Sequence, residues 1–492
     1  MDANLPSAPP GSSRQLRSAA SLRVLDGFGG SVRAACRTLV PSSTDELAAM
    51  LARANDAGVA VAMRGAGRSY GDAALSRDGL VLDACALNRI LSWDPSTGIA
   101  VAEAGVPLAD LWRRALPDGH WPAVVPGTMF PTLGGMASMN VHGKNQFKAG
   151  VFGEHVQWFD LVTPSGALVR ASRSENAELF HAALGGAGLL GAFARIALQL
   201  KPVESGRMKV ESIPVGSFAE QFEVFDARRA GADYLVSWID CFASGSAVGR
   251  GQIHVANHLH GSEDPRAKES LRLEEQELPS RIFGFPKSQL WRLMKPVLND
   301  PGMRFTNLAK YLSAKLAGRG HTYLQSHAAF AFLLDYVPGW RLAYGARGLL
   351  QHQLFVPEPA ARTVFPAALR LLQERGTPSY LGVLKRHKPD PFLLSHAFDG
   401  WSLALDFPLG RDGGTRLRAA LREVTEMVLG AGGKFYLAKD QLLEPGQIER
   451  AYGERLDRFF ALKAKIDPRA TMQTDQARRL FPERLRALRE GR

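Results

Sequence analysis

Hydrophobic and polar positions over the first two hundred residues switch repeatedly between helical and strand spacing. Apolar residues between 41 and 57 recur every three or four positions, and Ser43 and Glu46 have the spacing of a capping box, so a helix is predicted there. Further helices are predicted at 107–116 and 175–184. Short apolar runs predict strands at 59–63, 80–83, 90–93, 98–103, 156–163, 167–171 and 191–200. This mixed order of helices and strands indicates an α+β fold.

The pattern changes near residue 201, and residues 204–433 are interpreted as a separate α+β domain. Alternating or continuous apolar runs predict strands at 234–240, 328–334, 351–356 and 401–406. Residues 1–21 are rich in Pro, Ser and Gly and have no apolar run, which predicts a disordered tail and not a signal peptide. The remaining chain is therefore expected to divide into 22–203, 204–433 and 434–492.

Within the second domain, residues 280–320 are strongly basic and amphipathic. They include eight lysines and arginines and a single acid, Asp300. Helices are predicted at 287–297 and 304–317, the second with its large apolar residues on one face. Basic residues beside aromatics and leucines are typical of an interfacial membrane segment. A solvated helix pair packed on its own domain explains the same pattern, whereas a nucleic-acid surface is disfavoured because no recognition motif accompanies the charge.

Composition narrows the classes of protein that fit. The 492 residues are 46% hydrophobic, which is enough for the cores of two or three domains. No uncharged apolar stretch is long enough to predict a transmembrane helix. The three cysteines, Cys36, Cys85 and Cys241, have no metal-ligand spacing and fit buried thiols in a reducing compartment. No metal site is expected.

The most informative short stretch is residues 64–72, Arg-Gly-Ala-Gly-Arg-Ser-Tyr-Gly-Asp, which follow a predicted strand. A loop with three glycines brings bare backbone N–H groups to one point, and Arg64 or Arg68 beside them suits a pyrophosphate. The glycine spacing differs from the Gly-x-Gly-x-x-Gly dinucleotide fingerprint, and no Gly-Lys-Ser/Thr follows as in a nucleotide-triphosphate loop. An ordinary glycine turn at the end of a strand is the alternative.

A second glycine-rich segment runs from Pro126 to Asp160. It has a glycine every few residues and also contains His142, Lys144 and Asn145. Such a composition is unfavourable for a helix and for a packed strand. It is suited to backbone that must pass close to a large planar ligand.

These two segments, together with Tyr436-Leu-Ala-Lys-Asp440, resemble the vanillyl-alcohol-oxidase (PCMH-type) family of FAD enzymes, in particular its decaprenylphosphoryl-ribose oxidase branch. The resemblance covers residues 22–485. It implies a PCMH-type FAD-binding domain that begins with 22–203 and is completed by 434–492. It also implies that 204–433 form an inserted substrate domain with an antiparallel sheet over the flavin.

The resemblance implies that the glycine-rich segments hold FAD. Many members of the superfamily with covalent flavin have a histidine where this chain has Arg68, so noncovalent FAD is expected. The expected cofactor-binding residues are Arg64, Gly65, Ala66, Gly67, Arg68, Ser69, Tyr70, Gly71, Pro126, Gly127, Thr128, Gly134, Gly135, Asn140, His142, Gly143, Asn145, Gly150, Gly153, His155, Gly191, Ala192 and Tyr436.

Lys439 is the first candidate for a catalytic residue, either as a cation near N1 and the C2 carbonyl of the reduced flavin or as a contact to a substrate hydroxyl. It lies in the apolar stretch 435–440, interpreted as a strand, where a lysine is costly unless it is paired or used. A regular strand would point Tyr436 to the opposite face. Tyr70 and His142 are the other catalytic candidates, and the proton acceptor stays open among these residues and solvent.

Substrate contacts are also implied by the resemblance. His142 and Lys144 are two apart, so extended backbone puts both on one face. The implied substrate-binding residues are Lys144, through the substrate phosphate, Trp238, Gln353, Lys385 and Lys439. Some relatives carry a cysteine where this chain has Ala404, so no reactive thiol is expected at that position.

The implied reaction is FAD-dependent oxidation of a secondary hydroxyl of a sugar to a keto sugar, by hydride transfer to flavin N5. The expected substrate is a polyprenylphosphoryl pentose, and a short-chain reductase partner would complete an epimerisation. The expected location is the cytoplasm, with peripheral contact to the inner face of the membrane. The alternative is a soluble aldonolactone or alditol oxidase of the D-arabinono-1,4-lactone type. A binding protein without chemistry would leave the glycine motifs unexplained, and no nucleic-acid partner is expected.

Overall fold

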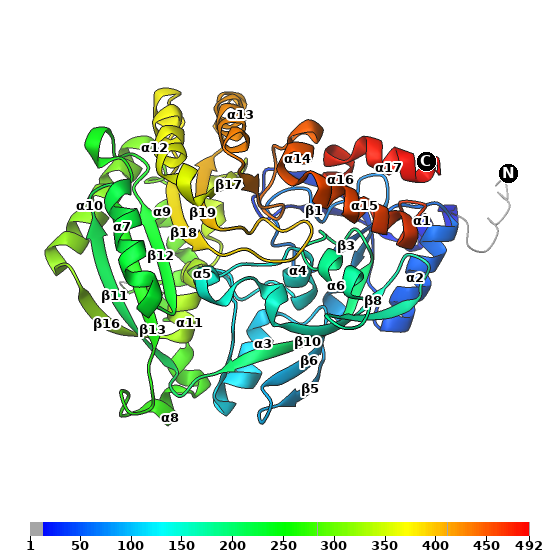
Figure 1. Ribbon diagram of the computed structural model, residues 1–492, viewed down its shortest axis with the longest axis horizontal. Coiled ribbons are helices and arrows are strands. Elements are labelled where there is room, and N and C mark those ends of the chain that lie inside the picture. The colour runs from blue at the N-terminus through cyan, green and yellow to red at the C-terminus, as the bar shows by residue number, and fades with distance from the viewer. Residues whose placement is uncertain (1–12, 283, 411, 492) are drawn as a thin grey trace.

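The computed structural model describes residues 13–282, 284–410 and 412–491, and its ribbon is drawn in Figure 1. Residues 1–12 of the predicted disordered tail lie outside the described residues. Residues Ser13–Ala19 form helix α1, so the prediction of disorder is wrong for this part of the tail. The helix is ordered because Leu16 and Ala20 are buried in one cluster with Leu47 and Leu51 of helix α2 (Thr44–Asp56).

The N-terminal part of the chain forms a small sheet that the C-terminal part completes. Its strands are β1 (Ser21–Asp26), β2 (Arg33–Leu39), β4 (Leu80–Asp83) and β3 (Val61–Arg64), in that order, and β3 and β4 run parallel. Val61 also pairs with Met472, and its backbone N–H donates to the Thr471 carbonyl at 2.7 Å. In Figure 1 the last helices lie beside the first ones.

A second sheet is antiparallel and follows in sequence. It has the order β5 (Ile90–Asp94), β6 (Ile99–Glu103), β10 (Ala192–Pro202), β8 (Val156–Val162) and β9 (Leu168–Ser172), and β7 (His120–Pro122) pairs with β10. The helices in this region are α3 (Leu108–Ala115), α4 (Leu133–Ser138), α5 (Gln146–Ala149) and α6 (Ala177–Ala183). Strands β5, β6, β8, β9 and β10 and helices α3 and α6 agree with the predicted elements to within two residues at each end. Strand β7 and the short helices α4 and α5 were not predicted, and α4 and α5 lie in the glycine-rich segment whose composition is unfavourable for a helix.

The third sheet is large and antiparallel. Its order is β16 (His321–Ser326), β11 (Arg207–Val215), β13 (Gly251–His258), β12 (Tyr234–Ile239), β18 (Leu381–His387), β19 (Gly400–Pro408), β17 (Leu349–Pro357) and β20 (Lys434–Phe435). Helices α7 (Phe218–Arg228), α10 (Asp300–Ala317), α12 (Glu358–Glu374) and α13 (Thr415–Gly430) lie along it (Figure 1). The sheet extends two residues beyond the predicted boundary at 433, and the division into an FAD-binding and a substrate domain stays a proposal.

The other described elements are short or lie near the C-terminus. They are α8 (Ala267–Ser270), β14 (Arg281–Ile282), β15 (Phe285–Pro286), α9 (Leu290–Met294), α11 (His327–Ala331), α14 (Pro445–Tyr452), α15 (Glu454–Ile466), α16 (Asp475–Leu480) and α17 (Pro482–Arg489). Within the described ranges, no helix combines the length and the apolar character that crossing a bilayer requires.

Three local predictions are wrong. Residues 328–334 form helix α11 and a short 3-10 turn instead of a strand, because the Ser326 hydroxyl caps the helix by accepting from the Ala329 N–H at 3.3 Å. The predicted helix at 287–297 is reduced to a 3-10 turn and the five residues of α9. The predicted capping box is wrong only in its second half: Ser43 is the N-cap and its hydroxyl accepts from the Glu46 N–H at 3.1 Å, but the Glu46 carboxylate accepts from the backbone and hydroxyl of Ser42 instead of the Ser43 N–H.

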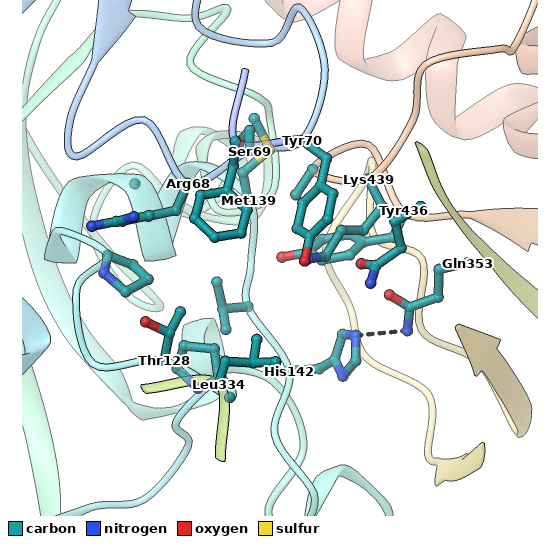
Figure 2. Close-up of a pocket in the computed structure, with 18 of the residues that line it drawn as sticks. Arg68, Ser69, Tyr70, Thr128, Met139, His142, Leu334, Gln353, Tyr436 and Lys439 are labelled. Carbon is teal, nitrogen blue, oxygen red and sulfur yellow. Dashed lines mark hydrogen bonds between the residues drawn. The ribbon is translucent and has the colours of Figure 1, made fainter. Parts of the chain in front are cut away.

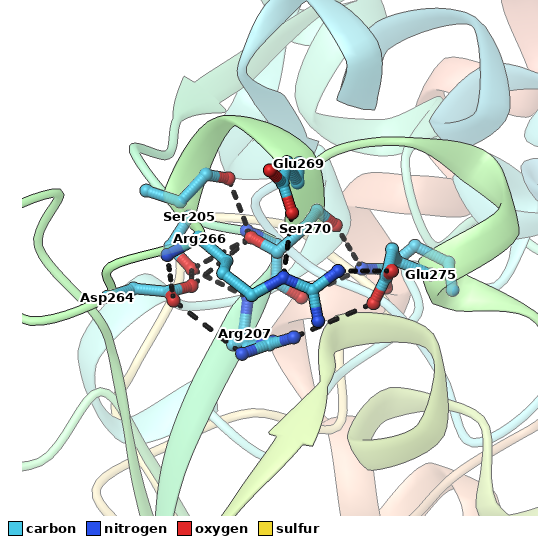
Figure 3. A network of polar contacts seen from close by, with 10 residues as sticks. Ser205, Arg207, Asp264, Arg266, Glu269, Ser270 and Glu275 are labelled. Atoms are coloured by element: carbon cyan, nitrogen blue, oxygen red, sulfur yellow. Dashed lines mark hydrogen bonds and ion pairs between the residues drawn. The ribbon is translucent and has the colours of Figure 1, made fainter.

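A polar network fixes the start of β11 to the loop that contains α8 (Figure 3). The buried Asp264 carboxylate accepts from the Ser205 hydroxyl at 2.6 Å and lies 3.6 Å from the Arg207 guanidinium. Arg266 bridges Glu269 and Glu275 at 2.7 and 3.0 Å. The network anchors this end of the large sheet, away from the cavity described next.

Candidate active site

A cavity of about 420 Å³ lies between the two glycine-rich segments and the face of the large sheet formed by β12, β17, β18 and β19. Its size is in the range of cofactor and ligand pockets. Most of the sequence-predicted site residues line it. They are Arg64, Gly65, Ala66, Gly67, Arg68, Ser69, Tyr70, Pro126, Gly127, Thr128, Gly134, Gly135, His142, Lys144, Gly191, Trp238, Gln353, Lys385, Tyr436 and Lys439.

The remaining candidates lie behind the wall of this cavity and support it. Asn140 has a left-handed backbone (φ 43°), and its side-chain oxygen accepts from the Gly153 N–H at 2.9 Å. Asn145 donates to the Ala123 carbonyl at 2.7 Å, and the His155 ring is 2.9 Å from the Ala149 carbonyl. The full set outside the lining is Gly71, Asn140, Gly143, Asn145, Gly150, Gly153, His155 and Ala192.

The glycine loop after β3 offers unpaired backbone donors to the cavity. In the described chain, no acceptor receives a hydrogen bond from the backbone N–H of Ala66, Gly67, Arg68 or Ser69. Gly67 has φ +63°, a left-handed conformation that glycine adopts without strain. A Cβ on Gly65 would lie 2.1 Å from the Thr132 hydroxyl oxygen, so glycine at 65 allows the two glycine-rich segments to pack together.

Both arginines of this segment line the cavity, but Arg64 is held by the backbone, whereas Arg68 keeps an unpaired donor. Arg64 donates to the backbone carbonyl of Asp26 at 3.0 Å and so holds β1 and β3 together. The Arg68 guanidinium lies between the rings of Phe28 and Phe130, 5.3 and 5.2 Å from their centroids. Its Nε is buried and has no partner in the described chain, so Arg68 keeps a charge and a donor for an anion.

Lys439 and Tyr436 both reach the cavity, because the chain turns there instead of continuing as a strand. Strand β20 ends at Phe435, and the Lys439 N–H donates to the Tyr436 carbonyl at 2.8 Å. The predicted strand and the opposite orientation of the two side chains are therefore wrong. The Lys439 ammonium lies 3.6 Å from the centroid of the buried Tyr70 ring (Figure 2). Burial lowers the pKa of Lys439 to about 7.

His142 is held by Gln353 across the cavity wall, with 3.0 Å between His142 Nε2 and the Gln353 amide nitrogen (Figure 2). Since the amide nitrogen donates, the imidazole nitrogen accepts, which requires a ring that is not doubly protonated. Burial lowers the pKa of His142 well below its usual value, in agreement with a neutral ring. His142 is thus a neutral ring that does not serve as a cation, and with Nε2 accepting from Gln353 its proton lies on Nδ1, which has no partner in the described chain.

One end of the cavity is cationic. Lys144 donates to the Phe330 carbonyl, and burial lowers its pKa to about 7. Lys385 comes from β18, and burial lowers its pKa to about 8. Two further lining residues at this end were not predicted from the sequence, Lys310 of α10 and His254 of β13. The Lys310 ammonium lies 4.2 Å from the Trp238 ring centroid. Repulsion from Lys385 also lowers the pKa of Lys144, and burial together with Lys310 and Lys144 lowers the pKa of His254, so this end of the cavity is a suitable site for an anion.

Asp406 was also missed, and it is the only carboxylate among the described residues that line the cavity. It lies on β19 opposite Gln351 of β17, whose amide donates to its Oδ1. The sequence offers only a weak indication of its place in the site: Asp406 is two residues after Ala404, the position where some relatives carry a cysteine, so the two side chains share one face of a strand. Which face that is depends on the pairing with β17 and β18.

Comparison with known proteins agrees with this geometry. A family model described as "FAD binding domain" matches residues 37–172. Decaprenylphosphoryl-beta-D-ribose oxidase of Mycolicibacterium smegmatis is 32% identical over 469 residues, which cover 93% of this chain and 97% of that protein. L-gulonolactone oxidase of Bos taurus is 31% identical over 162 residues, 33% of this chain and 36% of that protein.

The chain belongs to the vanillyl-alcohol-oxidase (PCMH-type) superfamily of FAD-dependent oxidoreductases. The residues present fit the cofactor. The four unpaired N–H groups and Arg68 offer donors and charge for the pyrophosphate of FAD. The glycines at 65, 67 and 134 leave room for close backbone approach, since a Cβ on Gly134 would lie 2.8 Å from the Ala104 Cβ.

The contact of Gly65 with Thr132 makes a prediction for FAD binding by this oxidoreductase. Gly65→Ala would force the two glycine-rich segments apart, and FAD content per protein is expected to fall at least about tenfold, equivalent to about 1.4 kcal/mol of binding free energy. The measurement is the ratio of flavin absorbance to protein absorbance after purification and dialysis.

Gly231→Ala is the matched control, because nothing lies within 4 Å of a Cβ at that position and its backbone φ is not left-handed. It should retain full FAD content. Equal FAD content in both variants would show that the close packing at Gly65 is not required for the cofactor.

Proposed function

We propose that this oxidoreductase oxidises a secondary hydroxyl of a polyprenylphosphoryl pentose to a keto sugar, as the first half of an epimerisation. The cationic end of the cavity is the observation that carries the proposal. Lys144 bonds a backbone carbonyl and Lys310 lies over an aromatic ring, and burial together with repulsion from Lys385 lowers the pKa of Lys144. Among the described residues, no carboxylate lines that end of the cavity. An anionic substrate group supplies the missing charge. The substrate named for the Mycolicibacterium relative, decaprenylphosphoryl ribose, has that chemistry.

The residues at one end of the cavity would bind the substrate phosphate, and those at the other end would contact the reacting hydroxyl. Bound FAD supplies the acceptor for the hydride that leaves the sugar carbon. The lysines at the cationic end would bind the substrate phosphate, and Trp238 would form a wall beside it. At the other end, Lys439 would lend positive charge to the reacting groups or contact a substrate hydroxyl. The neutral His142, whose Nε2 accepts from Gln353, would offer its Nδ1–H as a hydrogen-bond donor.

The aldonolactone or alditol oxidase alternative rests on a more limited match. The identity with L-gulonolactone oxidase covers a third of this chain. Lactones and alditols carry no charge, and they would leave three lysines without an anion. A short-chain reductase partner for the second half of the epimerisation remains part of the proposal.

The substrate class is tested by anaerobic bleaching of the flavin. We expect a short-chain prenylphosphoryl ribose or arabinose to bleach the protein, and free alditols and aldonolactones to leave it yellow at the same concentrations. In Lys310→Met, the half-saturating concentration of the prenylphosphoryl pentose should rise about tenfold or more, because a hydrogen bond to a charged group contributes about 1.5–3 kcal/mol.

Lys315→Met is the matched control, since Lys315 lies on the same helix, is exposed and does not line the cavity. It should leave the half-saturating concentration unchanged. Bleaching by free alditols or lactones, together with an unchanged half-saturating concentration in Lys310→Met, would favour the hypothesis of a lactone or alditol oxidase.

We further propose that FAD is bound noncovalently. The proposal is supported by Arg68, which stands where covalent relatives have a histidine and cannot form a histidyl bond to flavin. Acid precipitation of the purified protein is expected to leave the flavin in the supernatant. Flavin that stays with the pellet would overturn the proposal.

We also propose peripheral contact with the inner face of the cytoplasmic membrane through α10. Phe305, Leu308, Leu312 and Leu316 share one face of this helix and are all exposed, Leu316 at 88%. Arg304 and Lys315 flank them and are exposed too. The same helix places Lys310 in the cavity. A lipid tail could thus stay in the bilayer while its phosphate reaches the lysines.

Binding to vesicles rich in phosphatidylglycerol tests this contact. The double variant Phe305→Ser, Leu316→Ser is expected to bind at least about tenfold more weakly than the wild type, because each buried side chain contributes about 1.5–3 kcal/mol. Sedimentation with vesicles measures it, with FAD content as the check on folding.

Leu22→Ser with Val24→Ser is the control, since this pair on β1 is also exposed, at 67% and 76%, but is remote from the basic segment. It should bind like the wild type. Equal loss in both double variants would indicate nonspecific hydrophobic adsorption.

A further inference from the structure

Asp406 is a carboxylate in a cavity that is otherwise suited to anions. The described lining contains Arg64, Arg68, Lys144, Lys310, Lys385 and Lys439, but Asp406 is its only acid. A carboxylate there weakens the binding of an anionic substrate unless it has another use. Its side chain is 1% exposed, so its charge is not screened by bulk water.

The hydrogen bonds of Asp406 leave one oxygen free. Gln351 donates to Oδ1, whereas Oδ2 is buried and has no partner in the described chain. No ion pair within 4 Å joins Asp406 to Lys439 in the described chain, although each shifts the titration of the other. Asp406 Oδ2 and the Lys439 ammonium therefore line the same end of the cavity, and among the described residues neither has a charged partner within ion-pair distance. A substrate hydroxyl placed between them would give each of the two groups a hydrogen-bond partner.

We propose that Asp406 is the catalytic base that takes the proton of the substrate hydroxyl. The O–H bond breaks and its proton goes to Asp406 Oδ2, while the neighbouring C–H bond breaks and its electron pair leaves as hydride to the oxidised flavin. The sugar carbon becomes a carbonyl, and the protonated carboxyl returns its proton to solvent after product leaves. The proposal rests on the FAD-dependent oxidation of a CH–OH group and adds the proton acceptor to it.

The electrostatic surroundings suit a base that works near neutral pH. Burial raises the pKa of Asp406 to about 6, against the lowering effect of Gln351 and Lys439. The titratable groups that face it are Lys439, Tyr70 of the glycine loop, Tyr344 and Cys241, and burial raises the pKa of each of the last three. Among these neighbours, Lys439 is therefore the group that carries charge near pH 7. The deprotonated base forms as pH rises through about 6, so the rate of flavin reduction should rise over the same range.

The test is the rate of anaerobic flavin reduction in Asp406→Asn as a function of pH, with whichever sugar bleaches the wild type. We expect at least a 100-fold loss in the limiting rate and loss of the acidic limb of the pH profile. Binding of the corresponding deoxy sugar, which lacks the reacting hydroxyl and is followed by the perturbed flavin spectrum, should change less than threefold. A limiting rate within threefold of the wild type, with the acidic limb retained, would overturn the proposal.

Asp390→Asn is the matched control. Burial also raises the pKa of Asp390 to about 6, but its carboxylate is bonded to Ser395 and does not line the cavity. This variant should keep the acidic limb. If Asp390→Asn changes the acidic limb of the pH profile as Asp406→Asn does, then that limb does not reflect the titration of Asp406.

If the Asp406→Asn variant does not bind FAD, Gln351→Leu tests whether Asp406 is the catalytic base. Without the Gln351 hydrogen bond the carboxylate is less stabilised, so its pKa rises and the acidic limb should move to higher pH. An unmoved limb would overturn the proposal. The anaerobic bleaching of the wild type by different sugars tests the substrate class separately. The comparison of variants tests only the role of Asp406, because it can be made with any sugar that reduces the flavin.

Discussion

An excess of positive charge in one cavity is the constraint on which the rest of this structure depends. Among the described residues, six lysines and arginines and one aspartate line this cavity, and all of the six except the exposed Lys310 are half-buried. Cations removed from water are costly unless anions or hydrogen bonds replace the lost solvation. Two anions are available to do so, the pyrophosphate of FAD at Arg68 and the glycine loop, and the phosphate of the proposed substrate at the lysines of β18 and α10.

The fold brings these charges together from distant parts of the chain. The glycine loop follows β3, which is itself paired with residues near 472, and the backbone N–H of Tyr70 donates to the Ala438 carbonyl at 2.8 Å. That bond sets the turn at 436–440 against the glycine loop and places Lys439 over the Tyr70 ring. The large sheet then closes the cavity with Gln353, Lys385 and Asp406. The proposed cofactor site and the proposed substrate site thereby share one wall.

Much of this could be predicted from the sequence, and the failures have physical reasons. The glycine loop and its strand are local, so both were found, and the resemblance located most of the lining residues. Lys439 was assigned to a strand because the residues from Phe435 to Ala438 are largely apolar, but the strand ends at Phe435, and residues 436–438 are buried in a turn. Asp406, Lys310 and His254 were missed because their orientation depends on the pairing of strands and on a helix packed across the sheet, which no local pattern reports.

The most direct test of a charge-selected substrate compares two matched sugars in anaerobic flavin reduction by the wild type. One is a short-chain prenylphosphoryl pentose, and the other is the same prenyl pentoside without the phosphate. The account predicts that loss of the phosphate raises the half-saturating concentration about 100-fold, as expected for about 3 kcal/mol of charge-assisted binding, with little change in the limiting rate. Equal half-saturating concentrations for the two sugars would contradict it.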